Sequence, residues 1–146
     1  MGRDFVMQRR VQFAETDVGG VMHFSNYFRL MEECEHAFWR SLGLTVHQVR
    51  GGAVEFSWPR VAVSCEYFAP ARFEDVLELR LRIVKVSKSS VEHEIEFRRD
   101  GQRLALGRMT AVCCAVDGGA FRPIAIPEWV LEKLRSHKRE LRSEGV

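Results

Sequence analysis

The chain has 146 residues, of which 46% are hydrophobic and 29% charged, and its formal net charge is +2 at pH 7. This length and composition suffice for a buried core and exclude a disordered protein. The small net charge argues against nucleic acid as a partner, because such proteins carry a clustered basic footprint. No apolar run is long enough to span a membrane. We therefore expect one globular domain over residues 1–146.

No pair of cysteines has the CxxC spacing of a zinc site. The four cysteines are Cys34, Cys65, Cys113 and Cys114. The first residues also lack the apolar segment of an export signal. The sequence therefore predicts reduced thiols, a cytoplasmic location and no metal.

A strand is expected over residues 7–13, followed by a loop over 14–24 that contains glycines. From Ser25 to Leu42 the apolar residues recur three and four positions apart, which predicts a helix with a wide apolar face. Ser25 or Asn26 is the expected N-cap and Gly43 the expected stop. A further turn of helix is expected over residues 45–49.

The rest of the chain is dominated by residues that alternate between apolar and polar. Asp100-Gly101 is a hairpin-turn signal, and Pro127 is suited to begin a C-terminal helix. Consecutive strands with short links are antiparallel by default, so the pattern predicts an α+β fold in which sheet and helix bury each other. The later strands are expected at residues 60–68, 76–86, 90–99 and 103–116.

Three motifs in this order are similar to those of a known family. They are FAETDVGGVMHFSNYFRLMEE from Phe13, YFAPARFEDVLEL from Tyr67, and RPIAIPEWV from Arg122. The chain thereby resembles the hotdog-fold acyl-CoA thioesterases, in particular 4-hydroxybenzoyl-CoA thioesterase and the Tol-Pal-associated acyl-CoA thioesterases. The resemblance implies an antiparallel sheet of about five strands wrapped around one long central helix.

The same resemblance implies hydrolysis of an acyl-CoA to a carboxylate and free CoA, at a site between subunits of a dimer or tetramer. CoA is then part of the substrate, and no separate cofactor is implied. Asp17 matches the family's catalytic aspartate, as nucleophile or as general base for water. The backbone N–H of Phe24, at the start of the helix, matches the donor to the thioester oxygen.

Other residues near Asp17 are candidates with structural alternatives. His23 stands one position before the histidine of many relatives and could supply a proton or simply occupy the loop. Gly20 could adopt a positive φ angle or let the backbone approach the thioester. Asn26 could hold the loop that bears Asp17, and Tyr27 could contribute by packing. Glu15 is an alternative carboxylate, for which an exposed salt bridge is the simpler expectation.

Two further groups could contact the substrate. Lys88, with Ser89 and Ser90, matches the strand turn where the family binds the CoA nucleotide, although a solvated hairpin explains it equally well. Ser57 and Trp58 could line the acyl pocket.

Several alternatives remain open at this stage. Glu33 and His36 have the ExxH spacing of di-iron proteins, but the remaining ligands of such a site are missing. A hotdog dehydratase or hydratase would need a catalytic histidine loop that the sequence lacks. An acyl-CoA-binding protein without turnover would also fit. Phe24 resembles the dihydroxynaphthoyl-CoA branch and weakly favours aromatic acyl groups.

Overall fold

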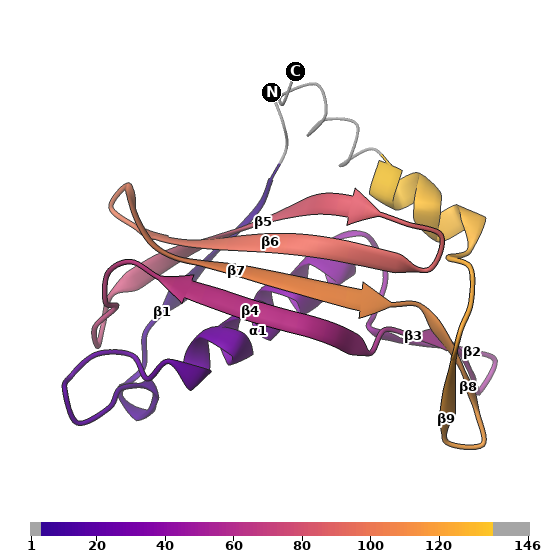
Figure 1. Ribbon diagram of the computed structural model, residues 1–146, viewed down its shortest axis with the longest axis horizontal. Helices are drawn as coiled ribbons and strands as arrows, with labels where there is room; N and C mark the ends of the chain where they lie inside the picture. The colour runs from indigo at the N-terminus through magenta and orange to yellow at the C-terminus, as the bar shows by residue number, and fades with distance from the viewer. Residues whose placement is uncertain (1–3, 136–146) are drawn as a thin grey trace.

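The computed structural model describes residues 4–135 and contains two antiparallel sheets (Figure 1). The larger sheet has the order β1-β5-β6-β7-β4, and the smaller has the order β2-β3-β8-β9. The larger comprises β1 (Phe5–Arg10), β4 (Arg60–Tyr67), β5 (Val76–Val86), β6 (Ser90–Arg99) and β7 (Gln102–Val112). The smaller comprises β2 (His47–Arg50), β3 (Ala53–Ser57), β8 (Cys114–Asp117) and β9 (Ala120–Pro123). The predicted α+β class with antiparallel strands is confirmed.

Helix α1 (Ser25–Ser41) lies against one face of the larger sheet (Figure 1). Its apolar stripe is buried, as the recurrence of apolar residues predicted, and Phe38 and Trp39 are fully buried. The helix packs tightly on the sheet at Gly107 of β7, where an added Cβ would lie 2.5 Å from Sδ of Met31. The missing side chain at Gly107 therefore makes room for the helix.

The ends of the secondary-structure elements differ in part from those predicted. The first strand begins earlier, at Phe5, and the short helix η1 (Phe13–Glu15) follows it. Residues 45–49 do not form a turn of helix, because His47–Arg50 pair with β3 as a strand. The expected strand over 103–116 is interrupted at Cys113, whose N–H donates to Ser89 O and so leaves the line of the ladder.

The predicted helix stop and hairpin turn are confirmed, and the predicted N-cap of α1 is wrong. Gly43 ends α1 with a φ of 77°, and Asp100 and Gly101 form the β6–β7 turn with φ angles of 49° and 80°. Neither Ser25 nor Asn26 caps α1, because the N-cap is Phe24, without a side-chain cap. The C-terminal helix is observed over residues 128–135, and its predicted remainder lies outside the described residues.

A buried cluster of charged and polar side chains links α1 to β4 and β6. Glu35 and His93 are both fully buried, and Arg60 is largely buried. Arg60 forms an ion pair with Glu35, and the second carboxylate oxygen of Glu35 lies 3.6 Å from Nε2 of His93. Neither ring nitrogen of His93 has a hydrogen-bond partner among residues 4–135.

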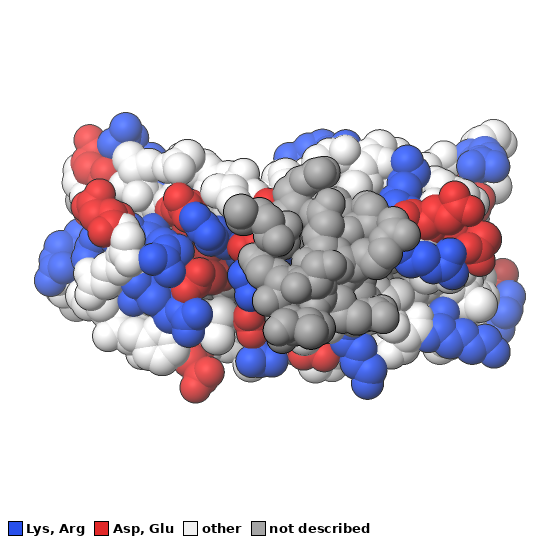
Figure 2. Space-filling model, turned by 90° about the horizontal axis from the view of Figure 1, so that it is seen from above, with Lys and Arg blue, Asp and Glu red and all other residues white. Residues whose placement is uncertain are grey.

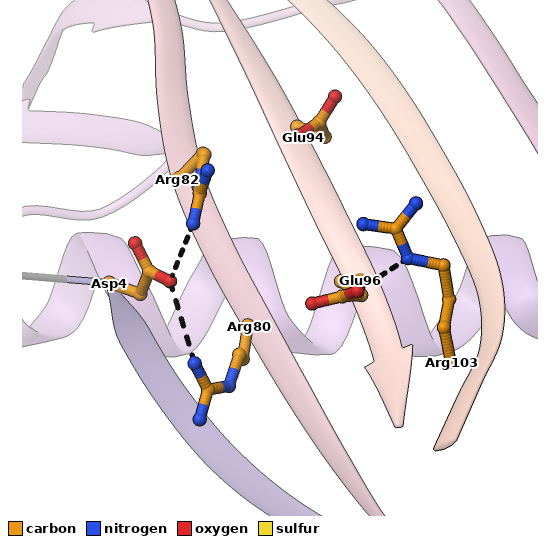
Figure 3. Close-up of a pocket in the computed structure, with 6 residues that line it drawn as sticks. All are labelled: Asp4, Arg80, Arg82, Glu94, Glu96 and Arg103. Atoms are coloured by element: carbon orange, nitrogen blue, oxygen red, sulfur yellow. Dashed lines mark hydrogen bonds and ion pairs between the residues drawn. The ribbon is translucent and has the colours of Figure 1, made fainter. Parts of the chain in front are cut away.

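The face of the larger sheet that points away from α1 is covered by paired charges (Figure 3). Asp4 lies between Arg80 and Arg82, and Arg103 donates to Glu96 over 2.5 Å. The hollow among these side chains is small, about 40 Å³. Positive and negative side chains also alternate on the side of the molecule seen in Figure 2. Where the described residues are visible, these surfaces carry both charges interspersed.

Candidate active site

Asp17 lies in a tight loop between β1 and α1. Its N–H donates to Val21 O over 2.8 Å, and its carbonyl accepts from Gly20 N–H over 3.0 Å. The side chain is exposed, and Oδ1 accepts the N–H of Gly19 over 2.8 Å. Among residues 4–135, Oδ2 has no hydrogen-bond or ion-pair partner. Gly20 has a φ of 79°, which an L-residue with a side chain rarely adopts.

The loop returns directly to the start of α1. Thr16 and Met22 form an antiparallel bridge, so Asp17 faces Val21 across the turn. Phe24 follows Val21 by three residues, so its Cα lies within about 11 Å of the Cα of Val21. The acid and the first turn of α1 therefore lie at the same end of the molecule.

The Phe24 N–H is free at this position. Ser25 N–H donates to Nδ1 of His23 over 3.2 Å, and Asn26 N–H donates to His23 O over 2.9 Å. Tyr27 N–H donates to Phe24 O over 3.3 Å. Phe24 has the helical angles φ −56° and ψ −31°, but its N–H has no acceptor within the described part of the chain. A free N–H at the positive end of a helix suits a developing oxyanion.

Contacts to the Glu15 carbonyl hold the loop on the helix. This oxygen accepts the N–H of His23 over 2.8 Å and Nδ2 of Asn26 over 2.9 Å. Asn26 is buried, so the loss of this partner would leave a polar group unsatisfied. The amide of Asn26 thus links the segment before Asp17 to the first turn of α1.

The Glu15 side chain also has a structural role. It is buried, whereas an exposed salt bridge was expected. Both of its oxygens accept hydrogen bonds from Arg9 of β1, which also binds Glu33 of α1. Although burial opposes it, hydrogen bonds from Arg9 and from Gln12 N–H keep the pKa of Glu15 below its ordinary value. Glu15 is therefore committed to an ion-pair network that ties β1, the loop and α1 together.

His23 and Tyr27 occupy different environments beside the loop. Nδ1 of His23 accepts from Ser25, so a neutral ring carries its proton on Nε2. The ring stacks on that of Phe24 with centroids 4.5 Å apart. Tyr27 is buried, with its ring edge-on to those of Tyr67 and Phe97.

Tyr67 was not singled out from the sequence as a site residue. Its hydroxyl donates to Phe24 O over 3.2 Å, from a strand more than forty residues away. Partial burial and the nearby Cys65 thiol raise the pKa of Tyr67 to about 12, so the hydroxyl remains a donor. No sequence signal marked this contact, because it depends on β4 lying beside the start of α1.

The other predicted site residues lie at the opposite end of α1. Trp58 is buried, and its ring stacks on Trp39 near the end of the helix, with centroids 5.0 Å apart. Ser57 is buried and contacts Nδ1 of His47 over 3.1 Å. A 17-residue helix is about 25 Å long, so one chain does not bring Ser57 and Trp58 to Asp17.

The turn between β5 and β6 is at this same opposite end (Figure 1). Lys88 is exposed there, and its carbonyl accepts Ile126 N–H over 2.9 Å. Ser89 O accepts Cys113 N–H over 2.7 Å, and Ser90 O accepts Ser87 N–H over 2.8 Å. These backbone bonds serve the fold and leave the Lys88 ammonium group in solvent.

Within the described residues, no three His, Cys, Asp or Glu side chains are grouped so as to hold a metal ion. Glu33 instead binds Arg9, and Nε2 of His36 lies 3.3 Å from Arg60. No helix within residues 4–135 is long and apolar enough to cross a membrane.

The α+β architecture with antiparallel sheets is that of the hotdog thioesterases. The chain belongs to the thioesterase-like superfamily, whose family model matches residues 11–134. The predicted resemblance is thereby confirmed, as is the prediction that the protein is a hydrolase of this type.

Individual relatives agree with this assignment. A 1,4-dihydroxy-2-naphthoyl-CoA hydrolase of Synechococcus is 33% identical over 131 residues, covering 85% of each chain. The acyl-CoA thioesterase YbgC of Haemophilus influenzae is 25% identical over 121 residues, covering 83% of this chain and 87% of its own. The crystal structure of a 1,4-dihydroxy-2-naphthoyl-CoA thioesterase from Synechocystis superposes with a TM-score of 0.79 at 25% identity, covering 91% of this chain and 96% of that one.

Proposed function

We propose that the protein hydrolyses an acyl-CoA thioester, with Asp17 as nucleophile or general base and the Phe24 N–H as donor to the thioester oxygen. The observation that carries the proposal is the Phe24 N–H, which has no acceptor among residues 4–135 and lies at the same end of the molecule as the exposed Asp17 carboxylate with its unused oxygen. CoA-thioester substrates are supported by the names of the relatives above. A thioesterase of this design needs no separate cofactor.

The roles follow from charge and position. The carboxylate of Asp17 attacks the thioester carbon or removes a proton from the attacking water. Negative charge then develops on the carbonyl oxygen, which the Phe24 N–H stabilises. Collapse of the intermediate expels the CoA thiolate, to which Nε2 of His23 could supply a proton. Where Asp17 is the nucleophile, water then cleaves the mixed anhydride, which releases the acyl carboxylate and restores Asp17. Gly20, Asn26 and Tyr27 keep the loop in position.

A second copy of the chain is part of the proposal. Strand β4 pairs with β7 on one side only and forms an edge of the larger sheet. Val61 and Val63 of this strand are 62% and 42% exposed, which a partner strand would cover. A two-fold axis at β4 would pair the two strands antiparallel and extend the sheet.

That axis would also complete the site. The two chains then run in opposite directions along β4. The end of one chain that carries Asp17 therefore faces the end of its partner that carries Ser57, Trp58 and Lys88. The acyl-pocket role of Ser57 and Trp58 and the CoA-binding role of Lys88, Ser89 and Ser90 are proposed for this shared site. Because its ring is buried, Trp58 would support the wall of the acyl pocket and so determine the shape of the pocket. One domain and a cytoplasmic location, where thiols stay reduced, complete the proposal.

The test is thiol release from a panel of acyl-CoA esters by the wild type and by Asp17→Asn. The asparagine can still accept the Gly19 N–H, so the loop should persist. We expect the variant to lose about a hundredfold or more in kcat and to keep its affinity for CoA. Asp100→Asn, the same charge change in an exposed turn, is the matched control. Full activity of Asp17→Asn would rule out the assigned role, and tight acyl-CoA binding without any wild-type thiol release would indicate a binding protein.

A further inference from the structure

A second hollow lies beside the C-terminal half of α1, away from Asp17. Its volume is about 380 Å³. The side chains that line it come from the helix and from the segment leading into β2: His36, Arg40, Thr45, Val46 and His47. One guanidinium and two imidazoles thus face a single space, and none of the lining residues is acidic.

The guanidinium of Arg40 is unpaired. Arg40 is exposed in the last turn of α1, and no carboxylate of residues 4–135 lies within ion-pair distance of it. This contrasts with most arginines of the larger sheet, where Arg99 and Arg103, for example, are bound to carboxylates. An unpaired guanidinium over a hollow is suited to an anionic oxygen group.

The two histidines add ring nitrogens to the hollow. Nε2 of His36 lies 3.3 Å from Arg60 and can only accept from a guanidinium, so the proton of a neutral His36 ring is on Nδ1. Nδ1 of His47 is engaged with Ser57, which leaves Nε2 of His47 unused. Both rings therefore have a second nitrogen that is not engaged within the described residues.

The helix end itself works against an anion, because the carbonyl groups at a C-terminus carry partial negative charge. An anion here would depend on the side chains and above all on Arg40. Replacement of Arg40 should therefore have a large effect.

This hollow lies at the end of α1 that faces the partner's Asp17 in the dimer proposed above. We propose that it binds an anionic oxygen group of the substrate whose thioester is attacked by the partner copy. This inference rests on the proposed function. The group is either a phosphate of CoA or a carboxylate on the acyl chain, and both have the chemistry that Arg40 recognises.

The experiment compares Arg40→Gln with the wild type on four thioesters. Butyryl-CoA and glutaryl-CoA differ by a terminal carboxylate, and the matching N-acetylcysteamine thioesters lack the phosphates. We expect a rise in KM of about tenfold or more for the esters that carry the recognised group, with little change in kcat. Arg40→Lys should restore part of the affinity, and Arg122→Gln, which removes an exposed arginine paired with Asp117, is the matched control.

The pattern of losses identifies the group. A loss confined to the two glutaryl esters assigns the acyl carboxylate, and a loss on both CoA esters but neither N-acetylcysteamine ester assigns a phosphate. Equal KM values for variant and wild type on all four esters would overturn the proposal. Wild-type inactivity on every ester would count against the proposed hydrolysis instead.

Binding can be followed without turnover. The imidazole NMR signals of His36 and His47 should shift when inorganic phosphate or sodium glutarate is added to the wild type. The shifts should be lost in Arg40→Gln. Unmoved signals with both anions would overturn the proposal whatever the enzyme activity.

Discussion

Replacing Arg60 with methionine would remove the cation that neutralises Glu35 in the core. Removing one partner of a buried ion pair typically costs about 3–5 kcal/mol. The Arg60 side chain is 21% exposed and that of Glu35 is 0% exposed, so water reaches the arginine but not the carboxylate. We therefore expect a loss near the lower limit, about 3 kcal/mol of unfolding free energy. For a chain of this size, that lowers Tm by about 6–12 °C.

His93 makes the loss depend on pH. Burial and the charge of Arg60 hold the pKa of His93 at about 3, so the ring is neutral in the wild type. Because the pKa of His93 is lower in the folded than in the unfolded chain, the neutral ring contributes its full share of the unfolding free energy above about pH 6.5. That contribution is lost as the pH falls. Without Arg60, the Glu35 carboxylate 3.6 Å away favours the imidazolium. The pKa of His93 should then rise, and the variant should recover stability relative to the wild type as the pH falls.

The assay is urea unfolding at one protein concentration, from about pH 8 to about pH 5.5. The double variant Glu35→Met/Arg60→Met should unfold close to the wild type, because replacing both partners with apolar residues is often nearly neutral. Adding His93→Gln to Arg60→Met should abolish the recovery at low pH. The reasoning is refuted if Arg60→Met lies within about 0.5 kcal/mol of the wild type, or if the double variant is less stable than Arg60→Met.

Gly107→Ala should lower the unfolding free energy by about 1–2 kcal/mol, because the new methyl group meets Sδ of the buried Met31. Met31→Ala in the same chain should remove that clash, and additive losses in urea unfolding would contradict the contact. Asn26→Ala should cost about 1–3 kcal/mol by leaving Glu15 O without its amide donor, and it should lower kcat more than it raises KM. Unchanged kcat in thiol-release assays would show that this amide does not position the loop.

The main helix and most strands were predictable because their signals are local. The spacing from Ser25 to Leu42 belongs to α1 itself, and the alternation of β5 and β6 belongs to those strands. The small sheet was missed because β2 has only four residues and depends on pairing with β3. The break at Cys113 was missed for a similar reason, since its N–H and carbonyl bind Ser89 and Ile124. Within a continuous apolar run, nothing local indicates such a break.

The position of the candidate site in the chain follows from a local motif, and its role stays a prediction. Asp17, Gly20 and Phe24 are close in sequence and lie in one loop, which is also held by the Met22 N–H donating to Ala71 O. The burial of Glu15 could not be predicted, because its partner Arg9 also needs Glu33 of α1 to complete the network. The hydroxyl of Tyr67 reaches Phe24 only because the sheet order puts β4 at that edge.

Asp17 lies near the N-terminal end of α1, whereas Trp58 and Arg40 lie near its C-terminal end. This separation has a genetic consequence. On the proposed arrangement, each chain contributes its acid to one site and its helix C-terminus to the other. A chain without Asp17 and a chain without Arg40 would each be defective alone. In a mixed dimer, however, one site would receive both lesions and the other would receive neither. Two mutant alleles could then complement each other within a single cell, which is not possible for a site contained in one chain.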